Sequence, residues 1–175
     1  MSELSAATEF VADYVLGQEL RVRILTTAEE TDGQFDLTDQ VMPVGGMTAL
    51  HLHARYEERI WVVSGSFDLW AASEHVTLRP GDFYTIGLNV PHAIHAGPDG
   101  GRALTLSSPA GFGKVIARTA TPVELASPDT ELNTELFMAV TEELGDVILG
   151  PPGAVPADLG RAEAGSSGAT SPRRR

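Results

Sequence analysis

The chain has 175 residues, of which 42% are hydrophobic, and its formal net charge at pH 7 is −12. This length predicts a single domain, the acidic charge argues against a nucleic-acid partner, and the absence of cysteine excludes disulfides, thiolate ligands and cysteine nucleophiles. No apolar run is long enough for a membrane helix and the N-terminus lacks the features of a signal peptide, so we expect a cytoplasmic protein with no membrane partner.

The first part of the chain predicts a short arm followed by a β domain. Residues 1–19 form the arm, with a short helix over residues 5–16. Residues 20–118 hold short runs rich in branched and aromatic side chains, separated by turn signals such as Ser64-Gly65 and Pro98-Asp99-Gly100-Gly101. Many short strands at this spacing predict a sandwich or barrel. The expected strands are Leu20–Thr26, Gln34–Met42, Thr48–His53, Ile60–Val63, Ser66–Ala71, Val76–Leu78, Asp82–Ile86, His92–His95 and Ala103–Ser107.

The C-terminal part predicts one packing helix and a tail. Apolar residues recur at helical spacing from Leu132 to Leu144, start signals stand at Ser127-Pro128-Asp129, and Gly145 is a stop signal. Residues 119–159 are therefore expected to form a C-terminal helix and extension. Residues 160–175 are rich in Gly, Ala, Ser and Arg, which predicts a disordered tail.

Three histidines and one carboxylate form the pattern with the most chemical content. His51 and His53 are two residues apart in a predicted strand, so both imidazoles point to one face. Glu58 starts the next strand of the same hairpin, and His92 follows a turn and can close the group from a distant strand. Imidazole nitrogens and a carboxylate oxygen around one point are typical ligands of a divalent transition metal.

The other histidines and Glu57 have different expected positions. His95 is three residues from His92, so alternation turns it to the opposite face, and His75 falls at a predicted hairpin tip in solvent. Glu57 is one residue out of phase with Glu58 and is the alternative carboxylate ligand. A His-x-His pair in a strand can also arise by chance alternation or from a polar core histidine. The residues around this pair favour the metal site.

That frame resembles the first motif of the cupin superfamily. It runs from Gly45 through His51, His53 and Glu58 to Gly65, and is followed by Pro80-Gly81-Asp82 and by Pro91-His92. The spacing also favours Glu58, because Glu58 preserves the six-residue interval to Gly65. The second motif departs from the family pattern at Gly87, Asn89 and Ala96, none of which is a ligand position.

The resemblance implies a mainly β fold, a cupin-type double-stranded β-helix or jelly-roll barrel over residues 20–118 with a C-terminal helix. The wider frame is similar to single-domain cupins related to quercetin dioxygenases. Relatives of this kind are often homodimers, so we expect a homodimer whose interface includes Trp61, Val63 and the N-terminal strand.

The ligand set His51, His53, Glu58 and His92 predicts one divalent metal, with Fe, Mn, Co, Ni, Cu and Zn not distinguished by sequence. Four protein ligands on an octahedral metal leave two positions for a chelating substrate, or for substrate and dioxygen. The inward-facing neighbours predict an apolar pocket for a flat substrate with one chelating edge. These neighbours are Met47, Ala49, Ile60, Val62, Ile94 and one of Leu104 or Thr105, with Leu104 preferred.

Three functions follow, in order of preference. The first is a metal-dependent dioxygenase acting on a flavonol-like or polyketide-like enol, with Glu58 as ligand and general base. The second is a non-redox cyclase, isomerase or decarboxylase of secondary metabolism in which the metal is a Lewis acid. The third is a cupin that binds a small molecule without turnover.

Overall fold

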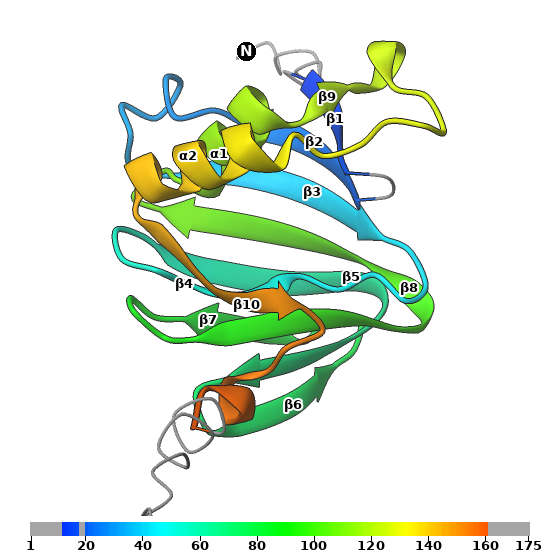
Figure 1. The fold of residues 1–175 in the computed structure, drawn as a ribbon, viewed down its shortest axis with the longest axis vertical. Coiled ribbons are helices and arrows are strands. Elements are labelled where there is room, and N and C mark those ends of the chain that lie inside the picture. The colour runs from blue at the N-terminus through cyan, green and yellow to red at the C-terminus, as the bar shows by residue number, and fades with distance from the viewer. Residues whose placement is uncertain (1–11, 18–19, 161–175) are drawn as a thin grey trace, which may run out of the picture.

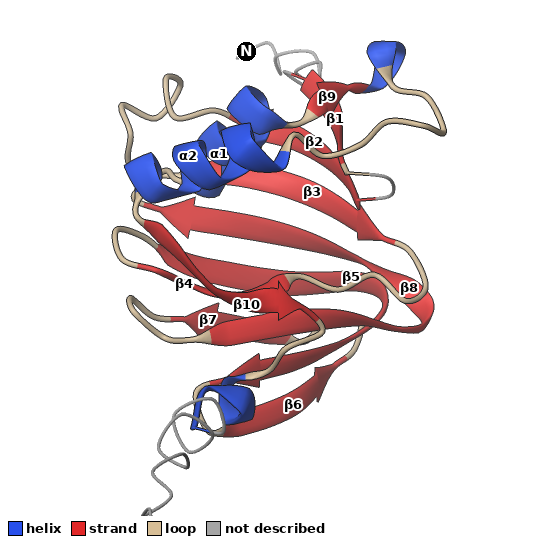
Figure 2. Cartoon of the chain, viewed as in Figure 1, coloured by secondary structure: helices blue, strands red, loops and turns tan. Residues whose placement is uncertain are grey.

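The computed structural model describes residues 12–17 and 20–160. Nearly all of the predicted disordered tail and the first part of the predicted arm lie outside the described residues. The described residues form ten strands, two α-helices and two short 3-10 helices (Figures 1 and 2). The prediction of a mainly β barrel with a C-terminal helix is confirmed.

The strands form one continuously hydrogen-bonded sheet that curls around an interior. Its path runs β10-β4-β8-β3-β2-β1-β9, and β5 joins β8 to β6 and β7. The bounds are β1 Ala12–Leu16, β2 Leu20–Thr26, β3 Asp36–Met42, β4 Ala49–His53, β5 Glu57–Ala71, β6 Glu74–Leu78, β7 Phe83–Ile86, β8 His92–Ser108, β9 Thr121–Pro122 and β10 Asp146–Pro152.

Two of the strands are far longer than the sequence predicts. Each of β5 and β8 joins two runs that were expected to be separate, and they pair antiparallel from Glu57↔Ser108 to Ala71↔His92. Register shifts fall on either side of Gly65, where a turn was expected. Gly65 has φ +69°, and a Cβ there would lie 2.1 Å from the carbonyl oxygen of Gly100. The glycines at these positions thus allow a bulge and close backbone approach within continuous strands, rather than chain reversals.

The expected helix over residues 5–16 is wrong for its described part, because residues 12–16 form strand β1. This strand pairs antiparallel with β2, from Ala12↔Ile24 to Leu16↔Leu20. Tyr14 and Leu16 pack against the buried cluster of Val22, Ile24 and Ile116. Pairing with β2 satisfies the backbone of a segment too short to hold a helix by itself.

The C-terminal part is more structured than predicted. Helix α1, Phe112–Thr119, was not expected, and it places Ile116 against β2. Helix α2 spans Thr134–Leu144, later than the predicted start, because the side chain of Asn133 caps it by accepting a hydrogen bond from the Leu136 amide. Both helices pack together over one side of the sheet (Figure 1). Short 3-10 helices η1 and η2 span Val123–Leu125 and Pro156–Asp158.

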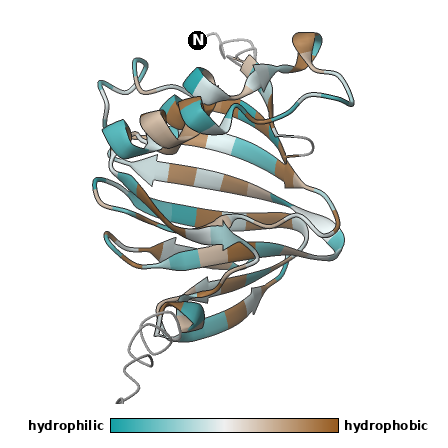
Figure 3. Cartoon of the chain, in the orientation of Figure 1, coloured by the Kyte–Doolittle hydropathy of each residue, from teal (hydrophilic) through white to brown (hydrophobic). Residues whose placement is uncertain are grey.

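The core lies inside the curled sheet and follows the two-residue period of the strands. Apolar side chains alternate with polar ones along most strands (Figure 3). The largest buried cluster consists of Met42, Ile60, Val62, Phe67, Leu69, Leu78, Ile86 and Ala103. No helix among the described residues is long and apolar enough to cross a membrane.

Asp36, a buried acid at the start of β3, links the barrel to the start of α1 through a hydrogen bond. Burial raises the pKa of Asp36 to about 6, although hydrogen bonds from Gly113, Gly111 and Ser107 favour its charged form. Its Oδ2 accepts a hydrogen bond of 2.7 Å from the amide of Gly111, just before α1. The neutral acid is therefore better accommodated in the folded state than the carboxylate.

This raised pKa predicts a pH dependence of stability. An acid whose pKa is higher folded than unfolded stabilises the fold below its unfolded pKa and loses that contribution as pH rises through the folded value. The shift from 3.8 to about 6 corresponds to about 3 kcal/mol. The free energy of unfolding of Asp36→Asn, relative to wild type, should therefore rise by up to about 3 kcal/mol between pH 4 and pH 7. Urea unfolding of both proteins across that range measures it, and a difference independent of pH would contradict it.

Candidate metal centre

Two strands bring three imidazoles to one point. β4 carries His51 and His53 on one face, and β8 begins at His92, which pairs directly with His51. The ring centroids lie 4.2 Å apart for His51 and His92, 4.8 Å for His51 and His53, and 4.9 Å for His53 and His92. One nitrogen of each ring lies within 4.8 Å of the others, the one such cluster of three potential ligands found among the described residues.

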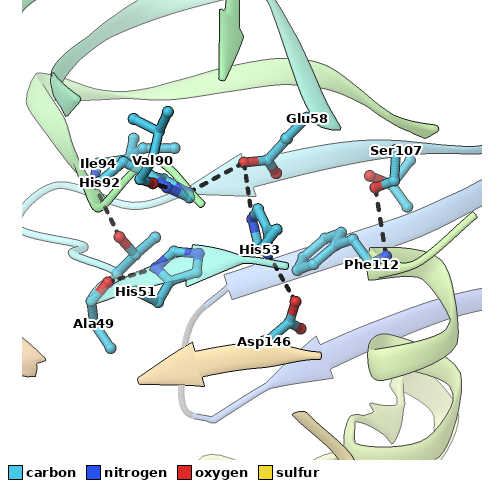
Figure 4. Close-up of polar contacts among 12 residues, drawn as sticks. Ala49, His51, His53, Glu58, Val90, His92, Ile94, Ser107, Phe112 and Asp146 are labelled. Carbon is cyan, nitrogen blue, oxygen red and sulfur yellow. Dashed lines mark hydrogen bonds and ion pairs between the residues drawn. The ribbon is translucent and has the colours of Figure 1, made fainter. Parts of the chain in front are cut away.

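Each imidazole is held through its Nδ1 atom. The Nδ1 of His51 donates to the Ala49 carbonyl at 2.8 Å, and that of His92 donates to the Val90 carbonyl at 2.9 Å (Figure 4). His53 uses its Nδ1 to bond Asp146. The Nε2 atoms of His53 and His92 are buried and have no hydrogen-bond partner. Buried nitrogens without partners are costly unless something binds there, and a metal ion would satisfy both.

Glu58 completes the group from the start of β5. Its Oε2 lies 3.6 Å from Nε2 of His53 and 3.5 Å from Nε2 of His92 (Figure 4). Burial favours the neutral acid, but the close imidazoles of His53 and His92 together lower the pKa of Glu58 below its usual value. Glu58 is thus a buried carboxylate in its charged form, the form that can act as a metal ligand.

The alternative carboxylate, Glu57, lies elsewhere. Its side chain is 41% exposed and forms an ion pair of 2.6 Å with Arg59 on the same strand. Strand alternation puts Glu57 and Glu58 on opposite faces of β5. Glu57 therefore does not join the histidine group.

The protonation of two of the histidines differs strongly. Burial, reinforced by the neighbouring His92 and His53, lowers the pKa of His51 to about 3, so its ring is neutral at pH 7. Burial also acts to lower the pKa of His53, but its hydrogen bond to Asp146 and the nearby carboxylate of Glu58 outweigh it and raise that pKa to about 9. His53 is therefore the imidazole that interacts most strongly with carboxylates, those of Asp146 and Glu58.

Asp146 is a residue of this site that the sequence analysis missed. It is the first residue of β10, pairs with His53 in register, and its Oδ1 accepts the His53 Nδ1 hydrogen bond at 2.8 Å. The sequence shows that Asp146 directly follows Gly145, the predicted end of the helix. An acidic residue at such a position is common, and nothing in the sequence links it to a histidine 93 residues away.

A cavity of about 570 Å³ opens beside the group. Such a volume is within the ~300–1,000 Å³ range of small-molecule sites. Of the predicted lining residues, Met47, Ala49, Ile60 and Ile94 line this cavity, together with His51, His53 and Glu58. Val62 does not line it and instead belongs to the buried core. On β8 the lining residues are Ala103 and Thr105, so the alternative Thr105 lines the cavity and the preferred Leu104 does not.

Part of the cavity wall comes from segments outside the predicted strands. Phe112 and Val115 of α1, Phe137 and Thr141 of α2, and Leu16 of β1 contribute to it. No lysine or arginine is among the described residues that line it. The interior is therefore mainly apolar apart from the histidine group and a few hydroxyl and amide side chains.

The two other histidines lie apart from this group. His75 is exposed on β6, where its ring stacks on Trp70 with centroids 4.3 Å apart. His95 also contacts Trp70, at 4.5 Å, on the side of β8 opposite to Ile94, which lines the cavity. Neither of them joins the three-histidine cluster.

The donor set fits a divalent transition metal. Three imidazole nitrogens and a nearby carboxylate are ligands that Fe, Mn, Co, Ni, Cu and Zn accept, and the buried unpartnered Nε2 atoms point to the same place. His51, His53 and His92 would hold the ion with Glu58 beside it. A metal there would be reached from the apolar cavity.

Comparison with known proteins identifies the class. Residues 38–107 match the family described as "Cupin domain". The chain is also 27% identical over 103 residues to quercetin 2,3-dioxygenase of Bacillus subtilis (strain 168), a match that covers 53% of this chain and 30% of that protein. Together these matches support membership of the cupin superfamily, and the matched region spans 30% of the length of this curated relative.

Solved structures agree with the fold. Ectoine synthase from P. lautus superposes with a TM-score of 0.56 at 17% identity, covering 87% of this chain and 94% of that one. The polyketide cyclase RemF from Streptomyces resistomycificus gives 0.51 at 23% identity, covering 73% and 90%. KdgF from Halomonas sp. gives 0.54 at 18% identity, covering 62% and 99%. At such identities the likeness establishes the fold alone.

Proposed function

We propose that this cupin is a metal-dependent dioxygenase acting on a flat, mainly apolar enol, of the flavonol or polyketide kind. The observation that carries the proposal is the placement of three convergent imidazoles and the buried Glu58 in an apolar cavity. The similarity to quercetin 2,3-dioxygenase supports the reaction class. The ligands proposed for the metal are His51, His53, His92 and Glu58.

In this proposal the three histidines would hold the metal and Glu58 would transfer the proton. A metal held by the three imidazoles would polarise a chelating oxygen of the substrate and favour its deprotonated form. Glu58 Oε2 lies 3.5–3.6 Å from Nε2 of His53 and His92 and would accept the proton of the enol hydroxyl. The Nδ1 bonds to Ala49, Val90 and Asp146 keep the imidazoles from turning during this transfer.

The cavity wall supports the choice of substrate. Ala49, Ile60 and Ile94 offer apolar contact near the histidines, and Phe112 and Phe137 add aromatic surface. A phosphorylated substrate is disfavoured, because a buried phosphate needs cationic or hydrogen-bonding partners and no described lysine or arginine lines the cavity.

The test is oxygen consumption by protein loaded separately with Fe, Mn, Co, Ni, Cu and Zn, with quercetin and a polyketide-like phenol as probes. Consumption of dioxygen matched to substrate loss, and no reaction without air, is the expected result. Turnover that persists without air, or with Zn alone, would replace this proposal by a Lewis-acid cyclase, isomerase or decarboxylase. A probe that binds and is recovered unchanged under all conditions would indicate a binding protein.

Substrate contact by α2 gives a separate prediction. Phe137 lines the cavity, whereas its neighbour Leu136 does not and is 42% exposed. Loss of part of the apolar contact of a phenylalanine is worth about 1.4 kcal/mol, so Phe137→Ala should raise KM for the probe about tenfold. Leu136→Ala is the matched control and should leave KM unchanged. Steady-state kinetics measure both, and equal KM values would show that Phe137 does not contact the substrate.

We also propose that the chain forms a homodimer through the outer face of β5. Trp61 and Val63 are exposed there, and Trp61 pairs across to the exposed Phe83 of β7. Light scattering of wild type and Trp61→Glu should show a dimer and a monomer. A wild-type monomer at micromolar concentration would contradict the proposal.

A further inference from the structure

The strand that carries two of the three histidines depends on a C-terminal segment. β4 pairs with β8 only at His51↔His92, but it pairs with β10 along its length, from Asp146↔His53 to Pro152↔Ala49. In Figure 1, β10 runs along β4 although nearly a hundred residues separate them in sequence. β10 also lies outside residues 38–107, which match the cupin family.

One of the three histidines is oriented differently from the other two. His51 and His92 donate their Nδ1 hydrogens to backbone carbonyls two residues earlier in their own segments. His53 donates to the carboxylate of Asp146 on β10, and the two side chains are only 3% and 5% exposed (Figure 4). A hydrogen bond to a carboxylate is stronger than one to a neutral carbonyl and fixes the ring orientation more firmly.

The end of α2 determines where β10 begins, and so where Asp146 lies. Gly145 ends the helix with φ +89°, and a Cβ at that position would lie 2.7 Å from the side chain of Arg55. The carbonyl of Gly145 accepts a hydrogen bond of 2.8 Å from the amide of Ala54, the residue that follows His53. The chain therefore enters β10 at a fixed place beside His53.

From this arrangement we infer that Asp146 is a positioning residue of the metal centre, which makes β10 part of that centre. The inference rests on the proposed metal-dependent function. Asp146 holds His53 so that its Nε2 faces the other imidazoles, and its charge strengthens His53 as a donor to a cation. Without Asp146 the ring can turn about its side-chain bonds, and ordering it again costs part of the binding free energy.

The test is the affinity for Co²⁺ by competition with a chromophoric chelator, together with the visible absorption spectrum of the Co²⁺ protein. Asp146→Ala should weaken binding about 10–100-fold, the usual loss when such a partner is removed, and should shift the spectrum. Asp146→Asn keeps an acceptor oxygen but loses the charge, so its loss should be smaller. Val147→Ala, at a 44% exposed position of the same strand, is the matched control and should behave as wild type.

A second set of variants shows whether Asp146 acts through His53. In protein that already carries His53→Ala, the weak residual Co²⁺ affinity is measured at high Co²⁺ concentration. The further change Asp146→Ala should leave that residual affinity unchanged, because the residue to be positioned is absent. Equal, additive losses in the two backgrounds would overturn the inference.

Two further results would overturn it. One is unchanged affinity and spectrum in both Asp146 variants, or in Asp146→Asn alone if the alanine variant does not fold. The other is a wild-type protein that binds no Co²⁺, which would remove the proposed function as well. Binding by wild type with no effect at Asp146 would remove only the role of β10.

Discussion

Replacing His51 with alanine should reduce bound metal from about one ion per chain to less than about one tenth of that, and abolish turnover. One of three convergent imidazole donors is lost, and the remaining pair with Glu58 would hold an ion far more weakly. His51 lines the cavity, so its truncation widens existing space instead of opening a void in the apolar core. Elemental analysis of untagged protein after equilibration with the metal measures the effect.

The control for this prediction is His75→Ala. His75 is exposed on β6 and lies outside the cluster, so this variant should keep full metal content and activity. Equal metal content in wild type and in His51→Ala would contradict the assignment of His51 as a metal ligand.

Replacing Glu58 with glutamine should lower turnover about 10²–10⁴-fold while the metal stays largely bound, because the amide keeps size and an oxygen donor but cannot accept a proton near neutral pH. Metal analysis and steady-state kinetics on the same preparation separate the two effects. Glu57→Gln is the matched control, since Glu57 pairs with Arg59 away from the cavity, and it should act as wild type.

The opposite result for Glu58 is also informative. Activity that falls in step with metal occupancy and recovers with excess metal would leave Glu58 as a ligand and remove its proton-transfer role. Catalysis would then depend on Lewis-acid activation by the metal alone.

The sequence was sufficient to predict the barrel and the meeting of the histidines. Alternation in a strand puts His51 and His53 on one face, and the short connection to β5 leaves Glu58 little choice of position. The turn residues before His92 start a strand in register with His51. The relation among His51, His53 and Glu58 is local, so it can be read from spacing, whereas the approach of His92 from a distant strand was an expectation supported by the cupin resemblance.

What sequence reasoning missed depends on contacts between distant segments. Gly65 and Gly100 look like turn residues, but in the fold they face each other across β5 and β8 as parts of bulges. Those bulges also set the register of β8, which is why Thr105 and not Leu104 faces the cavity. A single sequence does not carry these pairings.

The C-terminal contribution to the site was hidden for a similar reason. Residues 146–152 contain one glycine and two prolines in a short run, so they predicted an extension and not a strand. Pairing with β4 makes them β10 and brings Asp146 to His53. Phe112 and Phe137 reach the cavity only because α1 and α2 pack over the curled sheet.

The most direct test of the central claim is anomalous diffraction from crystals of the metal-loaded protein, recorded at the absorption edge of the metal. The account predicts one strong peak per chain, at roughly 2.0–2.2 Å from Nε2 of His51, His53 and His92, with Glu58 beside it. A peak at any other group of side chains, or none near these three nitrogens, would contradict it.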